Sequence, residues 1–164
     1  MYFMTKIYKS KYSLLKFINN KKSLKKKIGL CHGCFDIIHF GHALHFKSAK
    51  KKCDILIVTI TDDKFVNKGK NRPIFKSKER ALMLLGIKYI DGVYINKESS
   101  SVNLLEILKP NIYFKGYEYK KNININKNFI KEAKVAKKNK IKLHFTKDKT
   151  SSSTKILKKM HEQN

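Results

Sequence analysis

The segment Asp54–Thr61, DILIVTIT, restricts the possible folds more than any other part of this 164-residue chain. It is a run of apolar and β-branched residues without polar alternation, which is typical of a strand buried on both faces of a parallel sheet. Parallel strands need long crossover connections, which are usually helices. This strand therefore predicts an α/β protein in which strands and helices alternate.

The rest of the chain shows that alternation. Short apolar runs predict strands at residues 27–31, 54–61, 91–95, 111–115 and 141–145. Apolar residues three and four apart predict helices at residues 10–26, 41–51, 77–85, 102–108, 129–136 and 153–160. This order predicts a Rossmann-like α/β fold, with a doubly wound, mainly parallel five-stranded sheet and helices on both faces. We expect residues 1–164 to form a single domain, with the N-terminal helix of residues 1–26 as part of it.

Two helices give more detailed expectations. In the first helix, the spacing of Tyr12, Leu15 and Ile18 predicts the buried side. Ser77 resembles an N-cap, and Glu79 would lie in the first turn that follows it. The inward face of that helix is expected to carry the apolar residues Ala81, Leu82, Leu84 and Leu85.

The formal net charge of +26 would attract nucleic acid, anionic membranes or phosphorylated substrates. Only two of the 38 basic residues are arginines, Arg72 and Arg80, whereas base readout and phosphate forks favour arginine. The charge therefore favours a lysine-rich solvated surface over a specific nucleic-acid site. Residues 1–18 resemble neither a signal peptide nor an anchor, and no apolar run reaches membrane-spanning length. We expect a cytoplasmic protein with no membrane partner.

Cys31 and Cys34 form a C-x-x-C pair, which suggests redox chemistry or a metal site. A redox pair normally opens a helix directly after a strand, but here the helix is expected about seven residues later. A structural zinc site would need further ligands, and Cys53 alone does not complete the set. We therefore expect no metal held by protein ligands, and Cys31 is interpreted as the end of a buried strand.

Polar residues other than lysine follow several of the predicted strands. They are Asp36, His39, Gly41 and His42; Asp62 and Asp63; Gly116, Tyr117 and Glu118; and Thr150 to Thr154. Asp62 and Asp63 lead into a basic loop, residues 64–72. Ligands of open α/β sheets bind at the carboxyl ends of the strands, so these residues predict a binding site there.

His39 and His42 lie one helical turn apart and should face the same direction. Gly41 between them allows close approach to the backbone. Two imidazoles at a helix N-terminus suit a phosphate oxygen. Ser152, Ser153 and Thr154 precede another predicted helix and offer hydroxyl groups and unpaired N–H groups for a second anion, although simple N-capping would use the same residues.

Four segments together resemble one known family. GCFDIIHFGH (residues 33–42) is similar to the G-x-F-D-x-x-H-x-G-H signature of the cytidylyltransferase-like nucleotidylyltransferases. RPIFKSKERALMLLGIKYID (72–91), ILKPNIYFKGYEY (107–119) and SSSTKI (151–156) resemble later segments of that family in the same order. The likeness spans residues 10–160, which is nearly the whole chain.

This resemblance implies the transfer of a nucleoside monophosphate from an NTP to a phosphorylated acceptor, with release of pyrophosphate. It implies that His39, His42 and Lys68 are catalytic, and that Mg²⁺ accompanies the triphosphate. The nucleotide-binding residues would be Gly33, Cys34, Phe35, Gly41, Arg80, Gly116, Tyr117, Glu118, Ser152, Ser153 and Thr154. The residues that bind the second substrate would be Asp36, Lys50 and Asp63.

Within the family, the chain is most similar to adenylyltransferase domains that join ATP to a heptose 1-phosphate. The resemblance also implies a homodimer. Glycerol-3-phosphate cytidylyltransferases, which use CTP, and FAD synthetases are neighbouring alternatives, and a non-catalytic nucleic-acid-binding domain is an alternative of another class. Glu118 stands where the family usually has Asp, which concerns acceptor recognition. Lys147 stands where the glycerol-phosphate enzymes have Arg, which favours the heptose interpretation.

Overall fold

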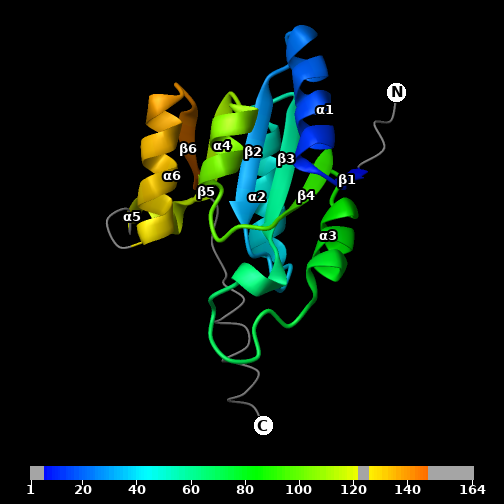
Figure 1. The fold of residues 1–164 in the computed structure, drawn as a ribbon, viewed down its shortest axis with the longest axis vertical. Coiled ribbons are helices and arrows are strands. Elements are labelled where there is room, and N and C mark those ends of the chain that lie inside the picture. The colour runs from blue at the N-terminus through cyan, green and yellow to red at the C-terminus, as the bar shows by residue number, and fades with distance from the viewer. Residues whose placement is uncertain (1–5, 122–125, 148–164) are drawn as a thin grey trace.

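The computed structural model of the chain describes residues 6–121 and 126–147, which form an α/β fold around one parallel sheet (Figure 1). Six strands lie in the order β1–β4–β3–β2–β5–β6, and every neighbouring pair is parallel. The strands are β1 (Lys6–Tyr8), β2 (Ile28–Gly33), β3 (Ile55–Thr61), β4 (Gly92–Asn96), β5 (Ile112–Gly116) and β6 (Lys142–Thr146). The predicted Rossmann-like fold is confirmed, with six strands in place of five.

Helices cover both faces of the sheet (Figure 1). The helices are α1 (Lys11–Ser23), α2 (Phe40–Lys50), α3 (Ser77–Leu85), α4 (Val102–Leu108), α5 (Tyr117–Lys121) and α6 (Lys127–Lys138), and a 3₁₀ helix spans Asp63–Phe65. The packing of their apolar side chains places α1, α4 and α6 on one face and α2 and α3 on the other. No helix within the described ranges has the length and apolar character that a membrane crossing requires.

Strand β3 contributes side chains to the hydrophobic cores on both faces of the sheet, as its unbroken apolar run predicts. Ile57 packs with the helices α1, α4 and α6, whereas Leu56 and Val58 pack with α2 and α3. All seven residues of β3 are buried. Because successive side chains of a strand point to opposite faces, a central strand with two covered faces needs apolar residues at nearly every position.

Several expected details differ from the structure. Strand β1 has only three residues and was too short to stand out in the sequence; its pairing with β4 at the edge of the sheet is a tertiary contact. Helix α5 was also not expected. Ile18 is buried as expected, but Tyr12 is 75% exposed, and Leu14 is buried with Ile18 in its place. The predicted helix from Ser153 lies outside the described residues.

Helix α3 has the predicted bounds, but its N-cap lies one residue earlier than expected. Its N-cap is Lys76 rather than Ser77, and the Glu79 carboxylate accepts the N–H of Lys76 at 2.7 Å. Ala81 and Leu84 pack into the core and are buried, while Leu82 is 61% exposed. The expectation that Leu82 packs inward is therefore wrong, because the apolar stripe is narrower than its four residues suggested.

The two leucines of α3 give a matched test of this packing. Leu84→Ala should lower the free energy of unfolding by about 2–5 kcal/mol, since it leaves a cavity in the core. Leu82→Ala should change it by about 0.5 kcal/mol or less, because the side chain is mostly exposed. Urea unfolding followed by circular dichroism measures both, and equal effects would contradict the observed rotation of α3.

Candidate functional site

The two histidines of the GCFDIIHFGH segment come together at the start of α2, beyond the carboxyl end of β2. His39 is the N-cap residue and His42 lies in the first turn, and their rings stack with centroids 3.8 Å apart at 20°. Both ring nitrogens of His39 and Nδ1 of His42 are buried and have no hydrogen-bond partner among the described residues. Buried polar atoms of this kind are costly unless a ligand completes their hydrogen bonds.

The environment keeps both imidazoles neutral. Burial, together with the neighbouring His39, His45 and Lys68, lowers the pKa of His42 to about 3. The pKa of His39 is also lowered, first by burial and then by Lys68. A neutral ring can still donate one N–H, and two neutral rings can stack without charge repulsion. The site can therefore hold a ready pair of donors in an electropositive environment.

Lys68 reaches this pair from the long loop between β3 and α3. Its charge acts on Cys34, His39 and His42, which places its ammonium group near all three. Gly69 follows it with a φ of +97°, a conformation that glycine adopts without strain. The structure thus brings together the three residues that the sequence assigns to catalysis, although they lie up to 29 positions apart.

The residues before His39 support the histidine pair. Gly33 ends β2, and a Cβ there would lie 3.0 Å from the Phe35 ring. Phe35 adopts a φ of +48° and is buried, and its ring packs edge-on against His42 with centroids 5.2 Å apart. The structure therefore shows Phe35 as a support for His42, and its contact with the nucleotide stays a prediction. Gly41 is buried in the first turn of α2.

Asp36 anchors the long loop to the histidine turn. Its side chain is fully buried, and Oδ1 accepts the N–H of Ile74 at 2.7 Å. Oδ1 also accepts the N–H of Phe75, and Oδ2 pairs with the guanidinium of Arg72. Because these groups surround the carboxylate, Asp36 positions the loop, and its contact with the acceptor stays a prediction.

Arg80 is a second buried clamp. Its guanidinium donates to three carbonyl oxygens, those of Phe75 at 3.0 Å, Thr61 at 2.8 Å and Cys34. It also donates to Oδ1 of Asp63 at 2.7 Å, and Cys34 Sγ lies at 3.9 Å. The five N–H groups of an arginine are then all engaged. Arg80 is 0% exposed, so the expected contact with the nucleotide is corrected to a structural role.

The remaining predicted residues divide into three groups. Asp63 accepts from Arg80 and from the N–H of Ser77 at 3.1 Å, and its contact with substrate stays a prediction. Gly116 ends β5, and Tyr117 and Glu118 open α5 at the same edge of the sheet. Their contact with the nucleotide also stays a prediction. Ser152, Ser153 and Thr154 lie outside the described residues.

Lys50 does not belong to this site. It lies in the last turn of α2, where Nζ donates to Asp54 O and to Asp91 Oδ2, both at 2.5 Å. Both partners precede strands, so they lie at the amino edge of the sheet. An 11-residue helix is about 16 Å long, which separates Lys50 from the histidines. The sequence carried a sign of this, because the helix predicted at residues 41–51 places Lys50 at the end opposite the histidines.

The C-x-x-C interpretation finds no support. Cys31 is fully buried within β2, and burial raises the pKa of the Cys34 thiol. Three free cysteines are present, and no cluster of three or more His, Cys, Asp or Glu side chains within the described ranges could hold a metal.

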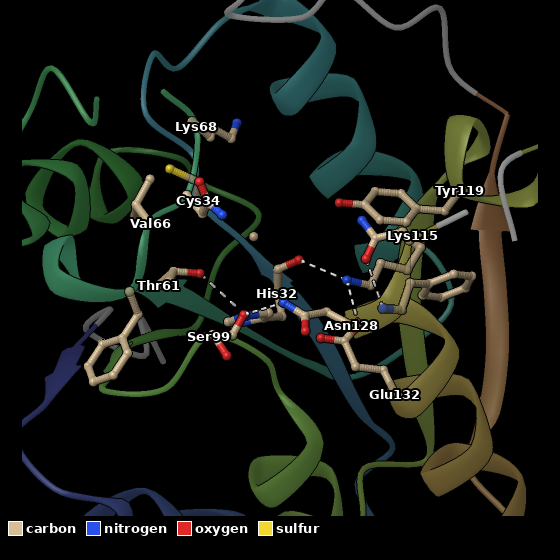
Figure 2. A pocket seen from close by; sticks show the side chains of 15 residues that line it. His32, Cys34, Thr61, Val66, Lys68, Ser99, Lys115, Tyr119, Asn128 and Glu132 are labelled. Atoms are coloured by element: carbon tan, nitrogen blue, oxygen red, sulfur yellow. Dashed lines mark hydrogen bonds and ion pairs between the residues drawn. The ribbon is translucent and has the colours of Figure 1, made fainter. Parts of the chain in front are cut away.

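A polar cavity of about 280 Å³ opens beside the histidine turn (Figure 2). It lies where the carboxyl ends of β2, β3 and β5 meet the start of α6. Its lining residues include Cys34 and Lys68 at one end and Lys115, Tyr119, Asn128 and Glu132 at the other (Figure 2). The sequence predictions missed Lys115 and Glu132. A signal was present, since Phe129, Glu132 and Ala136 have the spacing of one buried helix face.

A neutral histidine pair at a helix N-terminus, with a lysine nearby at the carboxyl edge of a parallel sheet, suits a protein that binds phosphate groups. Residues 30–159 match the family described as cytidylyltransferase-like, and the chain belongs to that family. The resemblance found in the sequence is thereby confirmed, and the protein is a nucleotidyltransferase.

Curated relatives share part of this sequence. The protein is 39% identical over 112 residues to the "Bifunctional protein HldE" of Campylobacter fetus, covering 67% of this chain and 24% of that protein. It is 37% identical over 124 residues to the protein of the same name from Helicobacter pylori, covering 74% and 27%. The chain thus spans about a quarter of the length of these relatives.

Two solved structures share the fold. One is a lipopolysaccharide core biosynthesis protein from Thermoplasma volcanium, with a TM-score of 0.62 and 23% identity over 76% of this chain and 99% of that one. The other is a pantoate-beta-alanine ligase from Francisella tularensis, with a TM-score of 0.60 and 18% identity over 96% and 78%.

The low pKa of His42 makes stability depend on pH. Its folded pKa is about 3, whereas the unfolded side chain titrates near pH 6.5. Between these pH values the unfolded state binds more protons than the folded state. The contribution of His42 to the free energy of unfolding is therefore complete above about pH 6.5 and is lost as the pH falls toward 3. His42→Gln should therefore flatten the fall in unfolding free energy between pH 6.5 and pH 4. Urea unfolding at each pH measures this, and parallel curves would contradict a buried neutral His42.

Proposed function

We propose that this chain transfers the nucleoside monophosphate of ATP to a heptose 1-phosphate, forming an ADP-sugar and pyrophosphate. The observation that carries this proposal is the stacked pair His39 and His42, with buried unpaired nitrogens at the start of α2 and the charge of Lys68 nearby. This arrangement suits the α-phosphoryl group of a nucleotide.

In this mechanism an oxygen of the acceptor phosphate attacks the α-phosphorus in line. The bond from the α-phosphorus to the bridging oxygen breaks, and its electron pair leaves with pyrophosphate. The attacking oxygen is already anionic, so no serine or cysteine nucleophile is needed. Catalysis then depends on positioning and on stabilising the charge of the transition state, which His39, His42 and Lys68 provide.

Mg²⁺ fits this proposal as a companion of the triphosphate. The carboxylates Asp36 and Asp63 near the histidines already accept hydrogen bonds from protein groups. Phosphate oxygens and water would therefore supply most of the ligands, as is usual for Mg²⁺ bound with a nucleotide. The ion would neutralise phosphate charge, while the described residues hold the loop and the histidines in place.

The choice of substrates rests on the relatives and on the polar cavity. The relatives named HldE favour ATP and a heptose phosphate over CTP and glycerol phosphate. The cavity beside Lys68 offers space for the organic part of an acceptor. A homodimer, implied by the family resemblance, stays a prediction. The net charge of +26 is the one observation that favours a nucleic-acid-binding function instead.

The test is a pyrophosphate-release assay with Mg²⁺ that crosses ATP and CTP with heptose 1-phosphate and glycerol 3-phosphate. We expect release only with ATP and the heptose. Release only with CTP and glycerol phosphate would overturn the substrate assignment and keep the mechanism. If no mixture releases pyrophosphate and the protein binds nucleic acid tightly and with a steep salt dependence, the proposed function is overturned.

His42→Ala should lower kcat by at least about 100-fold, because it removes a donor to the α-phosphoryl group. His144→Ala is the matched control, since this histidine lies on β6 and outside the site. Its kcat should stay within about twofold of the wild-type value. Near-normal turnover of the His42 variant, with an unchanged fold, would remove the histidines from the mechanism.

Variants of two lysines in the same loop distinguish the effect of a charge near the histidines from the effect of net charge. Lys68 acts on both histidines, whereas Lys70 is exposed and lines no part of the cavity. Lys68→Met should lower kcat/KM by about 10²-fold, and Lys70→Met should change it by less than about threefold. Steady-state kinetics at fixed ionic strength measures both. Equal losses would mean that net charge, rather than the position of Lys68, supports the reaction.

A further inference from the structure

A buried ion pair forms one wall of the polar cavity. Lys115 extends from β5 and Glu132 from α6, and Nζ lies 2.8 Å from Oε2. Their side chains are 5% and 2% exposed. Figure 2 shows the two side chains pointing toward one another at the end of the cavity opposite Lys68. Burying two charges is costly, and apolar residues of similar size often stabilise a fold as well or better, so a function of this pair has to be considered.

Groups of the protein itself donate hydrogen bonds to both carboxylate oxygens of Glu132. Oε1 accepts the N–H of Ser101 at 3.0 Å, and Oε2 accepts the hydroxyl of Tyr113 at 2.8 Å in addition to Lys115. The Tyr113 hydroxyl also lies 2.8 Å from Ser101 Oγ. Although burial alone would raise the pKa of Glu132, Lys115 and these donors hold it at about 2. The carboxylate is thus ionised and fixed in place.

The ammonium group of Lys115 has fewer hydrogen-bond partners than the Glu132 carboxylate. Among the described residues, its hydrogen-bond acceptors are Glu132 and, at 3.5 Å, the carbonyl oxygen of His32. The rings of Tyr119, Tyr113 and Phe129 lie 4.6, 5.0 and 5.7 Å from Nζ. An ammonium group has three N–H donors, so at least one remains for a ligand in the cavity that Lys115 lines.

The two ends of the cavity differ in charge. At one end, Lys68 and the nearby histidines suit a phosphate. At the other end, Glu132 neutralises Lys115, so a second phosphate gains little there. The rim adds an amide, Asn128, whose Nδ2 donates to Ser99 O at 3.0 Å while Oδ1 makes no hydrogen bond within the described ranges. Neutral hydroxyl groups, which both donate and accept, suit this end.

The aromatic side chains agree with that chemistry. Phe65, Tyr119 and Phe129 line the same cavity and offer apolar surface to the C–H groups of a ring. A ligand with a phosphate at one end and several hydroxyl groups at the other matches both ends of the cavity. A sugar 1-phosphate has this form, whereas glycerol 3-phosphate has only two hydroxyl groups and no ring.

We propose that the Lys115–Glu132 pair determines acceptor specificity by binding hydroxyl groups of the sugar ring while the Lys68 end of the cavity holds the phosphate. This assignment deepens the proposed function and rests on it. It makes Lys115 the donor that contacts the sugar and Glu132 the positioning residue that fixes and neutralises Lys115.

The test variant replaces both partners, Lys115→Met with Glu132→Gln, because removal of one charge would leave the other buried and unpaired. The matched control is Lys50→Met with Asp91→Asn, which removes an ion pair at the amino edge of the sheet. Calorimetric titrations at fixed ionic strength with heptose 1-phosphate and with glycerol 3-phosphate give the affinities of all three proteins.

We expect the wild-type protein to bind heptose 1-phosphate at least about tenfold more tightly than glycerol 3-phosphate. The Lys115/Glu132 variant should lose that preference, with glycerol 3-phosphate affinity unchanged within about twofold, and the control variant should keep it. Equal weakening for both ligands, or no change for either, would overturn the proposal. Absence of any preference in the wild-type protein would overturn it as well.

A single variant covers the case in which the double variant does not fold. Glu132→Gln keeps the size of the side chain and leaves Lys115 uncompensated, so the cavity wall becomes cationic. The preference for the sugar should then fall by at least about tenfold, and inorganic phosphate should bind more tightly than it does to the wild-type protein. A folded Glu132→Gln protein with the wild-type preference would overturn the proposal.

Pyrophosphate release separates failure of this assignment from failure of the proposed function. Sugar binding that depends on the pair, without turnover, would uphold the specificity role and reject the transfer reaction. Turnover whose KM for heptose 1-phosphate is the same in the double variant would uphold the reaction and reject the role of the pair.

Discussion

The guanidinium group of Arg80 connects the segments on which the site depends. It joins the turn after β2 through Cys34, the end of β3 through Thr61 and the loop before α3 through Phe75. These three segments are distant in the chain, and only the end of β3 belongs to the sheet. A buried cation with all its donors engaged can fix several carbonyl groups at once, which a lysine could not do with three donors.

Arg72 and Asp36 form a second connection of the same kind. Asp36 also accepts two backbone N–H groups of the loop, so the loop that carries Lys68 is fastened at its end next to α3. Both arginines of the chain are therefore used as buried clamps, while most of the lysines in the described ranges are exposed.

At the histidine site, neutral imidazole rings lie close to a positively charged lysine. Burial keeps His42 neutral, and Lys68 supplies the positive charge from a separate segment. Preorganised donors of this kind need no rearrangement when charge develops on a phosphoryl group. The neighbouring cavity adds a second environment, in which Lys115 and Glu132 cancel one another. The two lysines of the cavity, Lys68 and Lys115, thus lie in different electrostatic environments although both belong to the same strongly basic chain.

The sequence by itself determined the alternating fold, the parallel sheet and the His39–His42 pair. These features depend on local periodicity and on residues within one helical turn, and such patterns are read directly from the chain. The edge strand β1, with three residues, carried too little pattern to be recognised before its pairing with β4 was seen.

Only the tertiary structure decided which charged residues face the ligand. Asp36, Lys50 and Arg80 had suitable chemistry in the sequence, yet two are buried as clamps and one lies at the opposite edge of the sheet. Lys115 and Glu132, which lie 17 positions apart, meet only because β5 and α6 pack together. The physical reason is that the environment of a charge is set by long-range packing, which local sequence patterns do not encode.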